Sequence, residues 1–123
     1  TCFYDTGAPL NLIDGLSRHP GWALIYGDAT ALIFVRRVET LRKYWEGREL
    51  PMSRAYATMR AEAARLLAED DSRTMVYLAL GRAALNLGEL SEALHHYRRH
   101  LASDPQNREA QNAVKLLPGR IAP

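Results

Sequence analysis

Residues 74–107 read TMVYLALGRAALNLGELSEALHHYRRHLASDPQN, and this 34-residue stretch decides the fold. Apolar and small residues recur in it at the three- and four-residue spacing of one helix face. Gly88 interrupts that pattern once, and Asp104-Pro105 ends it. The stretch therefore predicts two antiparallel helices, over about residues 74–87 and 91–102, joined by a tight turn.

Small and large residues in this stretch follow a fixed spacing. Gly81 and Ala93 would let the two helices approach closely, and Tyr97 would fill the space between them. With these three, the residues in one register are Tyr77, Leu80, Gly81, Gly88, Ala93, Tyr97 and Pro105. The stretch resembles a tetratricopeptide repeat, although Ala84 replaces the family's usual Tyr and His100 its usual Ala. The resemblance implies a helical hairpin that binds another protein.

The flanks of the repeat look like half repeats. Residues 108–117 resemble the first helix of a next repeat, which we expect Pro118 to end, and residues 52–69 resemble a degenerate second helix of a previous one. The apolar stripe of this earlier helix predicts core positions at Met52, Tyr56, Met59, Ala63 and Leu66. Asp70-Asp71-Ser72 then offers caps for the helix that follows. Because stacked repeats need about three units, the single good repeat needs support from the rest of the chain.

The first 38 residues predict that support. Residues 1–4 favour a strand, residues 10–18 a helix, and residues 22–26 and 30–38 two strands of a hairpin around Gly27-Asp28-Ala29. The second strand is apolar from Ala31 to Val35, which predicts cover on both faces. The expected fold is α+β: a βαββ unit (1–38), connecting helices (39–73), and a tetratricopeptide-like hairpin with a capping helix (74–123), packed as one body.

A second resemblance concerns residues 1–40. Within them, residues 22–37 read WALIYGDATALIFVRR, a Trp-x-Leu pattern leading through Tyr and Asp into an apolar strand that ends in Arg. This is similar to the soluble C-terminal region of bacterial multi-spanning membrane proteins of glycosyltransferase-like type. The resemblance implies an extracytoplasmic accessory domain close to a membrane, part of a longer protein. It implies no catalytic residue in this chain.

Composition argues against several classes of function. Among the 123 residues, 16 basic and 14 acidic side chains give a net charge of +2, so no nucleic-acid partner is expected. The single cysteine, Cys2, excludes an internal disulfide and a cysteine zinc cluster. The longest apolar run is far shorter than the roughly 20 residues that cross a bilayer.

Two constellations could carry chemistry. Asp5-Thr6-Gly7-Ala8 resembles the active-site motif of aspartic proteases, but those enzymes need two such carboxylates and a largely β body. A strand-to-helix turn is the favoured interpretation, and an aspartic-type hydrolase is a remote alternative. Glu92, His96 and His100 lie four residues apart on one helix face. A metal site also needs ligands from another element, and the sequence indicates none. We therefore expect neither an enzyme nor a cofactor.

The sequence hypothesis for function is a non-catalytic protein-interaction or assembly domain. In the repeat register, the first helix would present a ligand groove made of Met75, Leu78, Arg82, Leu85 and Asn86. The expected ligand is a protein, a peptide or another part of the same parent protein. The alternative is that the βαββ unit packs against this face of the first helix and occupies it.

Overall fold

The computed structural model describes residues 11–28 and 31–121. The predicted strand at residues 1–4 and the Asp5 motif lie outside these ranges. The described chain begins with helix α1 (Asn11–Arg18), followed by an antiparallel hairpin of β1 (Trp22–Gly27) and β2 (Leu32–Arg36). Leu24 pairs with Phe34 and Tyr26 with Ile33, so a β-bulge at the intervening residue shifts the register.

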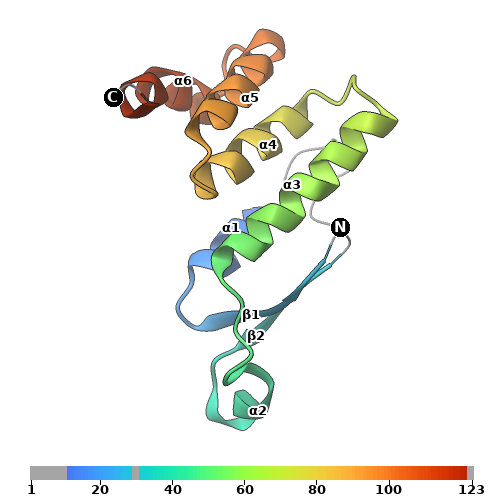
Figure 1. The fold of residues 1–123 in the computed structure, drawn as a ribbon, viewed down its shortest axis with the longest axis vertical. Coiled ribbons are helices and arrows are strands. Elements are labelled where there is room, and N and C mark those ends of the chain that lie inside the picture. The colour runs from blue at the N-terminus through green and yellow to red at the C-terminus, as the bar shows by residue number, and fades with distance from the viewer. Residues whose placement is uncertain (1–10, 29–30, 122–123) are drawn as a thin grey trace.

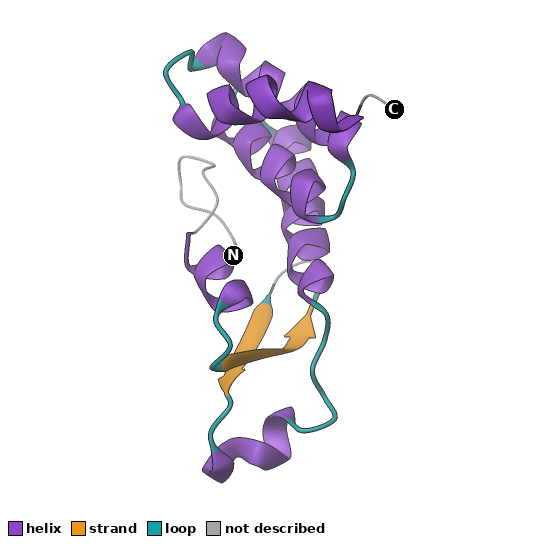
Figure 2. Cartoon of the chain, turned by 90° about the vertical axis from the view of Figure 1, so that its left-hand side faces the viewer, coloured by secondary structure: helices purple, strands orange, loops and turns teal. Residues whose placement is uncertain are grey.

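One expectation for the hairpin is wrong. β2 was predicted to be covered on both faces, but Ile33 is 47% exposed and its partner Tyr26 is 46% exposed. The described helices contact principally β1, so β2 has less cover. Figure 2 shows most of the helices (purple) above the two-stranded hairpin (orange). An unbroken apolar run therefore did not mean two buried faces here.

A short turn of 3-10 helix η1 (Glu39–Leu41) and α2 (Arg42–Trp45) follow at the end of the hairpin remote from the other helices (Figure 1). The chain then turns back and enters the long helix α3 (Met52–Glu69). Tyr56, Met59 and Ala63 of the predicted stripe are fully buried, and Leu66 packs beside them. Met52 was also predicted to be a core position, but it is 41% exposed. It is the first helical residue after Pro51 and lies at the end of the stripe.

The two helices predicted from residues 74–107 are present as α4 (Met75–Asn86) and α5 (Leu90–Ser103). Gly88 adopts a φ of 81° between them, a conformation that residues with a side chain rarely adopt. The predicted caps at residues 70–72 are not used for α4. Instead the Asp70 carboxylate accepts bonds from the Ser72 N–H and hydroxyl, and Thr74 precedes the helix without a side-chain cap.

The last helix, α6 (Arg108–Ile121), is longer than predicted. The Asn107 side chain caps its start by accepting a bond from the Ala110 N–H at 2.9 Å. Pro118 was expected to end the helix, but the helix continues through it. Proline removes only one hydrogen bond near a helix end, where the cost is smaller than in the middle.

The core has two parts, and α4 contributes to both. One face of α4 packs with α1, β1 and α3 through Val76, Ala79 and Ala83, and the other packs with α5 and α6 through Leu78 and Ala84. The result is α+β: a two-stranded antiparallel hairpin followed by helices α3 to α6, each packed on the next (Figure 1). None of the described helices is long and apolar enough to cross a membrane.

Candidate functional site

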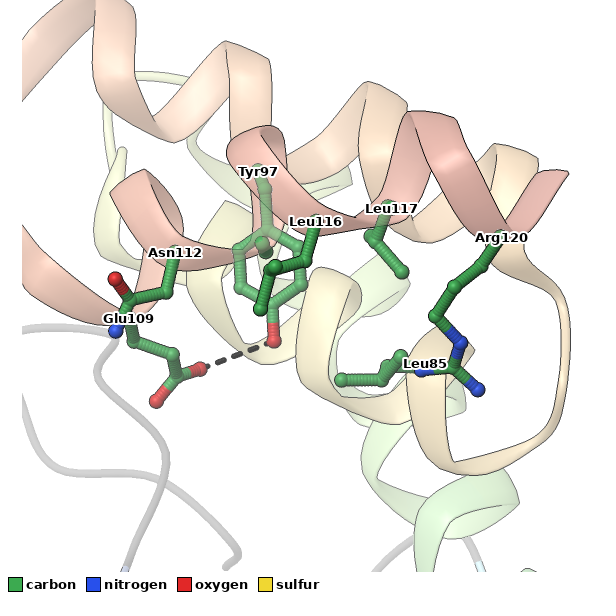
Figure 3. Close-up of a pocket in the computed structure, with 8 residues that line it drawn as sticks. Leu85, Tyr97, Glu109, Asn112, Leu116, Leu117 and Arg120 are labelled. Atoms are coloured by element: carbon green, nitrogen blue, oxygen red, sulfur yellow. Dashed lines mark hydrogen bonds between the residues drawn. The ribbon is translucent and has the colours of Figure 1, made fainter. Parts of the chain in front are cut away.

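An open hollow of about 240 Å³ lies where α4, α5 and α6 meet. We call it the α6 hollow, because most of its lining comes from that helix. The residues that line it are Leu85, Tyr97, Glu109, Asn112, Ala113, Leu116, Leu117 and Arg120. Figure 3 shows Glu109 and Asn112 toward one end and Arg120 toward the other, where Leu85 also lies.

The spacing along α6 explains this arrangement. Six lining residues recur after three, four, seven, eight and eleven positions from Glu109, which places them along one strip of the helix surface. Arg120 reaches the hollow only because the helix continues past Pro118. Of the lining residues on α6, Arg120 is therefore the one that depends on the part of the helix that was not predicted.

The floor of the hollow is rigid. Tyr97 is 1% exposed, and its hydroxyl donates a hydrogen bond to Glu109 Oε2 at 3.1 Å (Figure 3). A Cβ atom placed on Gly81 would lie 3.0 to 3.1 Å from three carbon atoms of the Tyr97 ring. Glycine at this position is therefore what lets α4 approach the ring, as the sequence spacing indicated. Burial, followed by the charge of Glu109, raises the pKa of Tyr97.

Arg82 lies next to the floor and joins two carboxylates. Its side chain is 12% exposed, and its Nε and Nη2 atoms donate to the two oxygens of Glu109 at 3.3 and 2.6 Å. Its Nη1 atom lies 3.2 Å from Asp14 Oδ2 of α1. Burial lowers the pKa of Arg82, but the bonds to Glu109 and the charge of Asp14 outweigh that effect and raise it. The guanidinium stays charged and is shared by the two carboxylates, although its Nη1 atom makes no hydrogen bond.

The same network reaches α3. The Tyr56 hydroxyl donates to the other oxygen of Asp14, so Asp14 links α1 to both α3 and α4. Burial, together with that hydrogen bond, raises the pKa of Tyr56 to about 12. Five helices are thus joined through Tyr56, Asp14, Arg82, Glu109 and Tyr97. Because each acidic group has a donor, the network holds the walls of the hollow in place.

The five predicted groove residues have different surroundings. Leu78 is buried, and Met75 packs against the same cluster. Arg82 is occupied by the network, and the Asn86 amide donates to the Arg82 carbonyl at 2.9 Å and accepts from Arg18 of α1 at 3.5 Å. Only Leu85 lines the α6 hollow. The structure thus places α1 against the polar end of the predicted groove.

The mouth of the hollow combines apolar surface with free charge. Leu116 is 63% exposed, although it lines the hollow. Within the described ranges, Arg120 and Asn112 take part in no hydrogen bond or ion pair. Such a surface can hold an apolar side chain of a partner and offer polar groups to the atoms around it.

The histidine face of α5 does not converge. His96 Nε2 lies 3.4 Å from Glu92 Oε1, whereas His100 is fully buried and its Nδ1 atom bonds the Thr74 carbonyl at 3.2 Å. Burial lowers the pKa of His96. No group of three or more potential ligands for a metal ion occurs within the described residues.

Sequence reasoning missed Glu109, Asn112, Leu116 and Arg120. Their spacing on α6 was available, but the expectation that Pro118 ends the helix removed Arg120 from the pattern. Comparison of the chain with protein-family models, with curated proteins and with solved structures found no match.

Proposed function

We propose that this chain is a protein-interaction module of tetratricopeptide type, which binds a peptide segment at the α6 hollow and carries out no chemistry. The observation that carries the proposal is Leu116, which is 63% exposed at the rim of a hollow whose floor residue Tyr97 is already bonded to Glu109. Exposed apolar surface beside a rigid concavity is typical of a binding site.

The helical hairpin supports the proposed repeat. Gly81 lies against the Tyr97 ring, Ala93 is fully buried, and Gly88 makes the turn between α4 and α5. α6 packs on α5 as the first helix of a following unit would. α3, α1 and the hairpin cover the other side of α4, which supplies the stability that a single repeat lacks.

The state of the acidic groups supports binding without chemistry. Glu109 is held by Arg82 and Tyr97, and Asp14 by Arg82 and Tyr56. Carboxylates that are paired in this way are poor general bases, since their lone pairs are occupied by fixed donors. This arrangement favours a stable binding surface over a reactive site.

A selection from random displayed peptides tests the proposal. Peptides enriched on the wild-type chain should lose at least about tenfold in affinity on Leu116→Asp, because a carboxylate in an apolar contact must be desolvated. Leu12→Asp is the matched control, since Leu12 is 66% exposed on α1 and does not line the hollow. It should bind as the wild type does. Equal binding by all three chains would place the binding surface elsewhere.

A further inference from the structure

The α6 hollow has an electrostatic preference as well as an apolar floor. Glu109 at one end is paired with Arg82, which it shares with Asp14, while Arg120 at the other end has no ion pair in the part of the chain that the structure describes. Arg108 and Lys115, elsewhere on α6, are also without a partner in that part. At the rim itself, Arg120 is the positive group that a carboxylate of a ligand would pair with.

We infer that the ligand is an acidic peptide segment in which one large apolar side chain enters the hollow and a neighbouring carboxylate binds Arg120. The inference rests on the proposed function and names the chemistry of its partner. At about 240 Å³ the hollow is smaller than the roughly 300 to 1,000 Å³ typical of sites for small molecules. It suits a single anchoring side chain, with the rest of the peptide lying across the rim.

The helix geometry sets the distance between the two ligand groups. Leu116 and Arg120 are four residues apart on α6, which is a rise of about 6 Å along the helix axis. An extended peptide advances by about 3.3 Å per residue. The acidic residue should thus lie about two positions from the apolar anchor. A carboxylate there meets a guanidinium that can bind it with two parallel hydrogen bonds.

A second copy of the chain is a poor occupant for the same surface. If two copies met through the hollow, each would bring Arg120 to the contact, and these like charges would repel each other. Glu109 could not offset them, because Arg82 already holds it. An acidic segment of another protein, or of another part of a parent chain, meets the charge requirement.

Three synthetic peptides, acetylated and amidated so that their termini are uncharged, test the inference. The first is Gly-Ser-Asp-Ser-Leu-Ser-Gly; the second has lysine in place of aspartate; the third has alanine in place of leucine. Affinities are measured by NMR titration of the whole chain at about 0.15 M salt, where charges beyond roughly 8 Å are screened. The first peptide should bind about fivefold more tightly than the second, and more tightly than the third.

Reversing the charge on the protein should reverse the order. Arg120→Glu should bind the lysine peptide more tightly than the aspartate peptide. Lys115→Glu makes the same charge change on the same helix outside the hollow, and it should preserve the wild-type order. Melting curves of both variants establish that they fold.

The outcomes separate this inference from the proposed function. Equal binding of the aspartate and lysine peptides, with loss for the alanine peptide, would overturn the acidic preference and leave the hollow as a binding site. Equal binding of the leucine and alanine peptides would mean attraction by charge alone and would overturn the anchor. If none of the peptides binds, both the inference and the hollow as a peptide site are refuted.

Discussion

Replacing Gly81 by alanine adds one methyl group at the closest approach of α4 and α5. The new Cβ atom would lie 3.0 to 3.1 Å from three carbons of the Tyr97 ring, whereas ordinary contacts begin near 3.4 Å. The ring cannot move away easily, because it is 1% exposed and its hydroxyl is bonded to Glu109. One of the two helices must shift instead.

The expected free-energy change follows from two opposed effects. Overpacking of a close-packed core costs about 1 to 3 kcal/mol. Alanine in place of glycine inside a helix returns about 0.5 to 1 kcal/mol. Gly81→Ala should therefore lower the free energy of unfolding by up to about 2.5 kcal/mol, and Gly81→Leu should lower it further.

Gly15 provides the matched control. It lies inside α1, and a Cβ atom placed there would have no neighbour within 4 Å. Gly15→Ala should raise the free energy of unfolding by about 0.5 to 1 kcal/mol, since only the helix effect remains. Urea unfolding followed by circular dichroism measures both variants. Equal shifts of the same sign would refute the close contact between Gly81 and Tyr97.

Two further predictions concern the polar network. Arg82→Ala should cost about 2 to 4 kcal/mol, because it leaves Asp14 and Glu109 without their positive partner. Arg73→Ala breaks a pair with Asp70 between side chains that are 38% and 47% exposed, and it should change the free energy of unfolding by less than about 0.5 kcal/mol. Equal losses would contradict the network. Since the pKa of Tyr56 is raised to about 12 from 10.0, the unfolded chain ionises first and the free energy of unfolding should fall between these pH values. Tyr56→Phe should flatten that decline in urea titrations from pH 9 to 12, and identical pH profiles would contradict it.

Local spacing was enough to predict α4, α5 and the turn between them. Gly81, Gly88 and Tyr97 lie within 17 residues of one another, and each has a steric reason to occupy its position. The buried stripe of α3 was predictable for the same reason, because it repeats along a single helix. The resemblance to a tetratricopeptide repeat rests on this local pattern and stays a proposal.

The network and the hollow were not predictable in the same way. Asp14 and Arg82 are 68 positions apart, and no periodic pattern connects a residue of α1 with one of α4. Arg82 was predicted to line a ligand groove. Nothing in the sequence indicates that Asp14 and Glu109 pair with its guanidinium. The predictions for Ile33 and Pro118 were wrong for a common reason. The burial of Ile33 and the helix end at Pro118 were both inferred from neighbours along the chain, whereas the fold sets the surroundings of these residues.

A peptide segment that binds in the α6 hollow must contact the leucine side chains that line it. The most direct test is an NMR titration of the chain, labelled at the leucine methyl groups, with a peptide enriched on the wild type. We expect the largest shifts at Leu85, Leu116 and Leu117, which line the hollow, and no change at Leu12, which lies outside it. Shifts concentrated at Leu12 or on the β1–β2 hairpin, with the three lining residues unmoved, would contradict it.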